Sequence, residues 1–167
     1  RTYVPSDRAA SRFADVVSAG AVPLTPARLL DTRPNGETID GVSQRTGRAR
    51  AGTSVVLQVT GRAGVPTDAR AVILNVTAVR PTMKGFLTVY PCGSSMPGSS
   101  NLNFEAGANV PNSVFARGGT GGRVCIFTSA DTEIVTDVNG YVPAGGMIAP
   151  LVPARLLDTR SAPGGST

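Results

Sequence analysis

The sequence predicts an all-β fold, an antiparallel β-sandwich or jelly-roll-like domain of about eight short strands. Runs rich in β-branched residues recur roughly every dozen positions, and within them apolar residues alternate with polar ones, as in strands that bury one face. Turn-forming residues separate nearly all of these runs, because 20 Gly and 13 Pro are spread along the 167 residues. Hydrophobic residues make up 41% and charged residues 16%, so the chain can bury a core.

The first strands follow from this alternation. The segment RLLDT, residues 28–32, is expected to form a strand or strand-like edge at the start of the domain. Residues 53–61 (TSVVLQVTG) and 71–79 (AVILNVTAV) follow, with one face made by Val55, Leu57 and Val59 and by Val72, Leu74 and Val76. Residues 71–79 carry Ile73, Asn75 and Thr77 on the other face, so we expect this strand to be covered on both sides.

The later strands are expected at residues 85–91 (GFLTVYP), 100–107 (SNLNFEAG), 112–117 (NSVFAR), 122–129 (GRVCIFTS) and 132–142 (TEIVTDVNGYV). The glycine-rich stretch GGTGGR, residues 118–123, lacks the lysine and the following helix of a phosphate-binding loop and is predicted to be a hairpin turn. A short helix is expected only in residues 7–19 (DRAASRFADVVSA), where no Gly or Pro interrupts the run.

An internal repeat divides the chain. PLTPARLLDTR at residues 23–33 returns as PLVPARLLDTR at residues 150–160, and only Thr25 and Val152 differ. A weaker match aligns the YVP that begins at Tyr3 with the YVP that begins at Tyr141. The repeat is the size of a domain. We therefore predict the tail of one unit plus a connector at residues 1–22, a complete unit at 23–143, and a connector with the opening of the next unit at 144–167.

Tyr3 and Tyr141 occupy equivalent positions next to the connectors, which suggests packing between units. We expect contacts between units at Tyr3, Tyr141, Pro153, Arg155 and Asp158. The predicted partners are adjacent repeats of the same chain or other copies of it, arranged head to tail.

Cys92 and Cys125 each lie at the edge of a strand-like run. If they pair, they close a loop of about 34 residues, which is worth ~3–4 kcal/mol. A disulfide would indicate export to an oxidising compartment, and two free buried thiols are the alternative. Two cysteines without histidine cannot complete a zinc site.

Asp31 and Asp137 each follow an apolar stretch and precede residues that favour turns, in LLDTRP and VTDVNG. Such carboxylates commonly accept backbone N–H bonds, and Arg28 and Arg33 offer planar donors nearby. We predict a strand-end lock, made of Arg28, Asp31, Arg33 and Asp137, that joins the first strand to the last. A calcium site at Asp137 and Asn139 is the alternative, but no EF-hand-like cluster supports it and no metal or cofactor is expected.

From Pro26 to Val142 the sequence resembles a module common in secreted proteins of high-GC Gram-positive bacteria. The resemblance rests on seven blocks in order: PARLLDTR, GVPTDARAVILNVTAV, GFLTVYPCG, SNLNF, PNSVFA, GRVCIF and VTDVNGY. It implies a β-rich extracellular module, often in tandem and often attached to secreted enzymes or surface proteins. It implies no catalytic residues.

Composition argues against several functions. Without histidine, a Ser-His-Asp or Cys-His arrangement is impossible in this unit. The carboxylates Asp31, Glu105, Glu133 and Asp137 could serve a glycosidase only if two faced one groove at the required spacing. The net charge of +5 comes with no aromatic near the closest basic cluster (Arg45, Arg48 and Arg50), which favours a solvated loop over nucleic-acid binding. No apolar run approaches the ~20 residues that span a membrane.

Two function classes remain. The favoured one is a non-catalytic extracellular or cell-surface structural or adhesive module, repeated head to tail in a stalk, fibre or coat. The alternative is a carbohydrate-binding accessory domain of a secreted enzyme, with cell-wall or extracellular polysaccharide as its partner. Sugar-binding surfaces usually display aromatic rings, and this chain has no Trp and three Tyr. A coplanar pair of exposed aromatic rings would favour the alternative.

Overall fold

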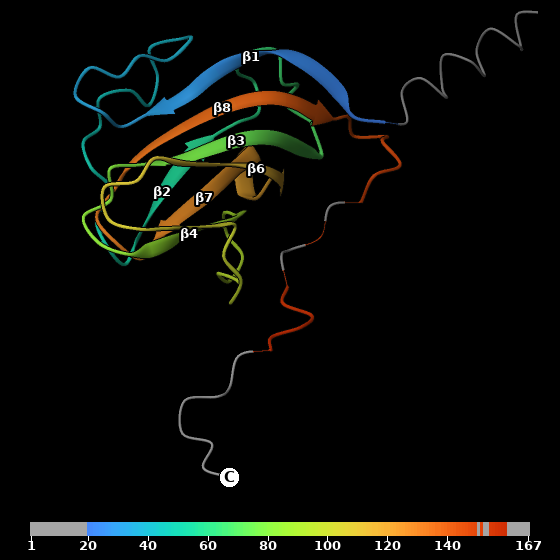
Figure 1. The fold of residues 1–167 in the computed structure, drawn as a ribbon. Helices are drawn as coiled ribbons and strands as arrows, with labels where there is room; N and C mark the ends of the chain where they lie inside the picture. The colour runs from blue at the N-terminus through green and yellow to red at the C-terminus, as the bar shows by residue number, and fades with distance from the viewer. Residues whose placement is uncertain (1–19, 150, 152–153, 160–167) are drawn as a thin grey trace, which may run out of the picture.

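The computed structural model describes residues 20–149, 151 and 154–159. In this part of the chain, eight strands form two four-stranded antiparallel sheets that pack face to face (Figure 1). The first sheet has the order β1-β8-β3-β6 and the second has the order β2-β7-β4-β5. The predicted all-β sandwich is therefore confirmed, and the repeated PARLLDTR lies in β1, at an edge of the first sheet.

The strands are β1 (Val22–Asp31), β2 (Thr53–Gln58), β3 (Ala71–Val79), β4 (Gly85–Pro91), β5 (Leu102–Phe104), β6 (Val110–Arg117), β7 (Arg123–Thr128) and β8 (Glu133–Val142). β3 and β4 have the predicted bounds. β1 begins six residues before the predicted RLLDT segment, since pairing of Val22 and Pro23 with β8 extends it.

The core lies between the two sheets, where the alternating apolar side chains meet. Leu57 and Val59 lie on the inner side of the second sheet, and Val72, Leu74 and Val76 on that of the first; all are at most 1% exposed. Burying each apolar side chain of this kind stabilises the fold by ~1.5–3 kcal/mol relative to leaving it exposed. The predicted inward faces of residues 53–61 and 71–79 are confirmed.

The prediction that β3 is covered on both faces is wrong. Ile73, Asn75 and Thr77 are half-buried, and Asn75 and Thr77 line an open groove on the outside of the first sheet. Neighbouring side chains shield this face in part, and no second layer of strands or helices covers it in the described part of the chain.

The glycine-rich stretch is not a hairpin turn. β6 belongs to the first sheet and β7 to the second, so residues 118–122 cross from one sheet to the other, through the 3₁₀ turn η1 (Thr120–Gly122). At Gly119, a Cβ atom would collide with the backbone N and O of Cys92. Glycine is needed there because the crossover passes directly against the end of β4.

The predicted helix at residues 7–19 and the predicted contact residues Tyr3 and Pro153 lie outside the described residues.

Candidate functional site

Pairing of β1 with β8 brings the strand-end lock together from the two ends of the domain. Arg28 on β1 lies opposite Asp137 on β8 in the strand register. Arg28 Nε donates to Asp137 Oδ1 at 2.8 Å, and its Nη2 donates to Oδ2 at 3.3 Å. The first and last strands are thus joined by a bidentate ion pair, the stronger geometry for an arginine and a carboxylate.

Asp31 is the buried centre of the lock. Its carboxylate is 0% exposed and accepts from Arg33 Nε at 2.8 Å, Arg33 Nη2 at 2.6 Å, Arg33 N at 3.2 Å and Arg28 Nη1 at 3.3 Å. Burial raises the pKa of Asp31, but the hydrogen bonds from Arg33 and the charges of both arginines outweigh it, so the pKa lies below its ordinary value. Asp31 is therefore held as a carboxylate.

The loop after β1 wraps around Asp31. The Asp31 backbone N–H donates to Ser43 O at 3.1 Å, and its carbonyl accepts from Arg45 N at 2.7 Å. A Cβ atom at Gly36 would lie 2.5 Å from Asp31 Cγ, so only glycine fits the turn that closes over the carboxylate. The predicted bonds from Asp31 to a backbone amide and to an arginine are both present.

Asp137 has a different setting from the predicted one. The turn-like letters VTDVNG lie inside β8, which continues to Val142. A register shift in the β3–β8 ladder lies between the pairs Ile73–Gly140 and Leu74–Val138. The Asn and Gly therefore accompany an irregularity within the strand rather than a turn at its end.

An open polar groove lies beside the lock on the outer face of the first sheet. It encloses about 320 Å³ and is lined by Arg28, Arg33, Asn75, Thr77, Val79, Asn109, Val135 and Asp137. A second hollow of about 500 Å³ shares Arg33, Val79 and Asn109 with it and adds Arg80, Asn35 and Pro34.

The acidic residues that could serve catalysis are all engaged. Besides Asp31 and Asp137, Glu133 bonds Arg80 at 2.8 Å and Glu105 bonds Lys84 at 2.7 Å. General acid or base catalysis needs a carboxyl that can exchange its proton with a substrate, and a guanidinium or ammonium group at bonding distance competes for that position. Among the described residues, no group of three or more His, Cys, Asp or Glu side chains could hold a metal ion.

A second ion pair, between the buried Arg62 and the partly exposed Asp40, was not predicted from the sequence. Arg62 Nε and Nη2 each donate to the Asp40 carboxylate at 2.7 Å, and Arg62 also donates to the carbonyls of Gln58 and Val42 at 3.0 Å. The Arg62 guanidinium lowers the pKa of Asp40 to about 2. This pair ties the loop after β1 to the end of β2; no periodicity or motif in the sequence pointed to it.

The basic cluster lies in a solvated loop, as predicted: the side chains of Arg45 and Arg50 are 52% and 76% exposed. Each of the three arginines nevertheless makes a hydrogen bond. Arg45 Nε donates to Gly36 O at 3.0 Å, Arg48 Nη1 to Arg80 O at 2.6 Å, and Arg50 Nη1 to Asp131 Oδ2 at 2.9 Å. These arginines fasten the loop after β1 to the rest of the domain.

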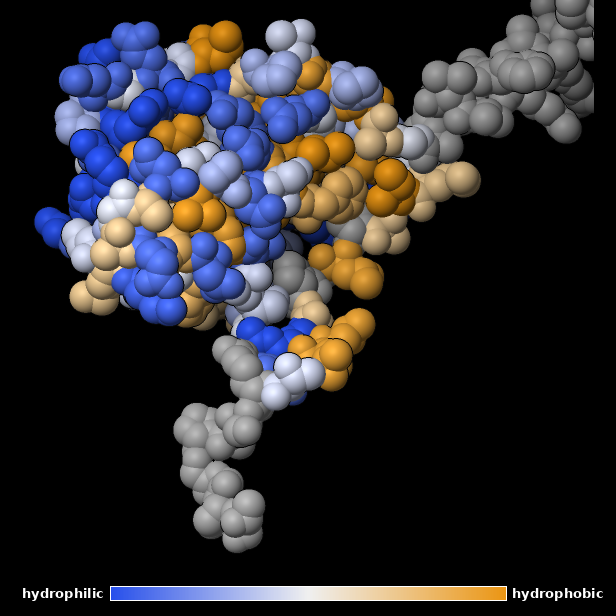
Figure 2. Space-filling model, in the orientation of Figure 1, coloured by the Kyte–Doolittle hydropathy of each residue, from blue (hydrophilic) through white to orange (hydrophobic). Residues whose placement is uncertain are grey.

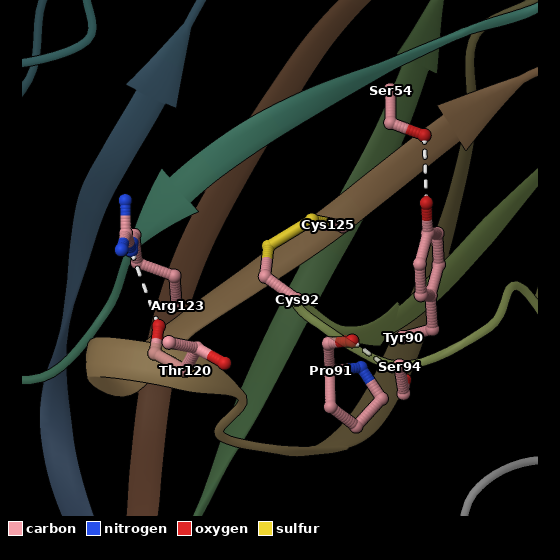
Figure 3. Close-up of a disulfide and its surroundings, with 8 residues drawn as sticks. All are labelled: Ser54, Tyr90, Pro91, Cys92, Ser94, Thr120, Arg123 and Cys125. Atoms are coloured by element: carbon pink, nitrogen blue, oxygen red, sulfur yellow. Dashed lines mark hydrogen bonds between the residues drawn. A yellow bond between two sulfur atoms is a disulfide. The ribbon is translucent and has the colours of Figure 1, made fainter.

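The two cysteines form a disulfide, as predicted. It joins β7 to the residue after β4 with an S–S distance of 2.00 Å and a sequence separation of 33 (Figure 3). The crossover packs on the same place, since Thr120 N donates to Cys92 O at 2.8 Å and Cys92 N to Arg123 O at 3.3 Å. The disulfide and these backbone hydrogen bonds together join the end of β4 to β7 and to the crossover.

The second copy of the repeat is exposed where the first is buried. Leu156 and Leu157 are 96% and 79% exposed, whereas the equivalent Leu29 and Leu30 are 0% and 1% exposed. Hydrophobic atoms are visible on the segment that follows the sandwich in Figure 2. Arg155 Nη1 nevertheless bonds Asp158 Oδ2 at 3.1 Å, the same atoms that pair in Arg28 and Asp31 at 3.3 Å.

Tyr141 packs within its own sandwich. It lies opposite Val22 on β1 and Val72 on β3, half-buried against the core. Contact of Tyr141, Arg155 and Asp158 with another unit stays a prediction.

The described aromatic side chains include one close ring pair, Phe86 and Phe127, on the outer face of the second sheet. Their centroids are 5.9 Å apart and their planes are inclined by 39°. The pair is tilted and half-buried, so it does not form the coplanar exposed platform that would favour sugar binding.

No protein-family model and no curated protein sequence matches this chain. Within its described residues, no helix has the length and apolar character needed to cross a membrane.

Proposed function

We propose that this chain is a non-catalytic structural or adhesive module of an exported surface protein, repeated head to tail in a stalk, fibre or coat. The observation that carries the proposal is the repeat itself. PARLLDTR forms the edge strand that closes one sandwich, and the same sequence follows that sandwich with its leucines exposed. A second edge strand of this kind is what the opening of a further unit would supply.

Three further observations support it. The Cys92–Cys125 disulfide is compatible with an oxidising, extracellular location. The candidate acidic residues are held in ion pairs. The seven sequence blocks resemble a tandem module of secreted proteins. In this account the partners are neighbouring repeats or copies, with no nucleic acid, cofactor or membrane insertion.

Sedimentation velocity of the disulfide-bonded chain over a hundredfold concentration range tests the proposal. We expect the mean sedimentation coefficient to rise with concentration, and we expect no co-sedimentation with cellulose, chitin or purified cell wall. A chain that stays monomeric and pellets with one of these polysaccharides would instead be the carbohydrate-binding accessory domain.

A further inference from the structure

The residues of β1 that lie against the edge of β8 have counterparts in the second copy of the repeat. β1 is the outermost strand of the first sheet, and β8 is its partner strand there. The loop after β1 adds a bridge between Asp31 and Gln44 and a bond from Ile39 N to Arg28 O, so strand exchange replaces the β8 ladder together with these few loop contacts. Residues 150–160 repeat residues 23–33 except at one position. All the side chains through which Arg28, Leu29, Leu30 and Asp31 hold β1 in place therefore recur in the second copy.

The second copy already carries part of the local geometry. The Arg155–Asp158 bond reproduces the Arg28–Asp31 bond three residues apart. The two leucines that would enter the core, Leu156 and Leu157, are exposed on their own unit. Burying two leucines is the largest favourable contribution available to this segment, because each is worth ~1.5–3 kcal/mol.

The path of the connector leads the second copy away from the β1 edge of its own unit. Its residues instead border a hollow of about 600 Å³ beside the second sheet, which is lined by Phe86, Gly98, Ser100, Asn103, Arg155, Leu157, Asp158 and Thr159. After β8 the chain turns, with Gly146 N donating to Pro143 O at 2.9 Å. Arg70 N donates to Val142 O at 2.8 Å, and Arg70 Nη1 to Gly146 O at 3.3 Å. Arg70 precedes β3, which flanks β8 on the side opposite β1. The connector is therefore held on the β3 side and leaves the β1 side of β8 out of its direct path.

We infer that the β8 edge is an interface for strand exchange: it accepts residues 154–159 of a second copy of this chain in place of its own β1. Leu156 and Leu157 then occupy the positions of Leu29 and Leu30, and Asp158 occupies that of Asp31. This inference deepens the proposed function, on which it rests for the head-to-tail arrangement, because it names the surface that joins two units.

The test uses the full chain with Leu29→Asp and Leu30→Asp, which prevents β1 from entering the core. Each copy then has one vacant β8 edge and one intact donor segment. We expect a folded protein whose mass by light scattering is at least twice that of the monomer, since head-to-tail donation fills every edge. The matched control adds Leu156→Asp and Leu157→Asp, and we expect it to be unfolded. Leu156→Asp with Leu157→Asp alone should leave a folded monomer.

A second measurement covers the case in which buried aspartates prevent assembly. The synthetic peptide PLVPARLLDTR, added to the fourfold variant, should restore the β-sheet circular dichroism spectrum, whereas PLVPARDDDTR should not. Strand exchange between copies is overturned if the Leu29→Asp/Leu30→Asp chain folds as a monomer, which would place its second copy on its own unit. It is also overturned if the chain stays unfolded and the peptide restores nothing. Either result leaves the concentration-dependent association of the wild-type chain, and hence the proposed function, to be judged separately.

Discussion

At the scale of single residues, Asp31 is a buried carboxylate whose stability depends on its hydrogen-bond donors. A fully buried carboxylate is tolerated only because four donors from Arg28 and Arg33 reach it. Asp31→Ala should lower the free energy of unfolding by ~1–3 kcal/mol, because the donors lose their acceptor. Urea unfolding monitored by circular dichroism measures the change. Glu105→Ala, which removes an exposed ion pair, is the control and should leave the midpoint unaltered; an equally small effect of Asp31→Ala would contradict the lock.

Asp40 gives the domain a defined response to acid. Its pKa is lowered to about 2 from 3.8, so the stabilisation is complete above pH ~4 and is lost as the pH falls through about 2. The Asp40 side chain is 33% exposed, and solvent screening reduces the effect to ~1 kcal/mol.

The stability difference between wild type and Asp40→Asn measures this contribution, because the titration of Asp31 cancels between the two proteins. The difference should be constant from pH 7 to 5 and should shrink by ~1 kcal/mol between pH 4 and pH 2. Urea midpoints across this series supply the data. A difference that does not vary with pH would show that the Arg62 pair does not control the titration of Asp40.

At the scale of strands and crossovers, the disulfide fastens the end of β4 to β7 and holds the crossover from β6. Replacing both cysteines, Cys92→Ser with Cys125→Ser, should lower the free energy of unfolding by ~3–4 kcal/mol on the loop-entropy model, since the two cysteines are 33 positions apart. Thermal unfolding with and without reductant measures it. Reductant should lower the midpoint of the wild type and leave that of the variant unchanged. Equal midpoints for oxidised and reduced wild type would contradict a stabilising role.

Some strands and contacts could be predicted from the sequence, and others could not. β3 and β4 follow from the alternation of their side chains. Arg28 and Asp137, 109 residues apart, could be predicted as partners from their opposite charges, although both lie within strands and not at strand ends. The sheet that a strand joins is decided by packing of the whole chain, so GGTGGR could not be recognised as a crossover. Arg62 and Asp40 escaped prediction for a related reason: they lie outside the named strands, where no period marks which side chain turns inward.

At the scale of the whole molecule, one sandwich ends with β8 and is followed by the sequence that began it. In the proposed array, a connector of about a dozen residues with Pro143, Pro150 and Pro153 would limit the separation and swing of successive units. A ten-residue strand such as β1 spans ~33 Å. Units joined in this way should therefore repeat at a spacing on the order of 40 Å.

Electron microscopy of the native protein measures that spacing directly and tests the proposed head-to-tail array. We expect rows of similar globular units with one regular axial repeat. Isolated single units, each with the second PARLLDTR docked on its own sandwich, would contradict it.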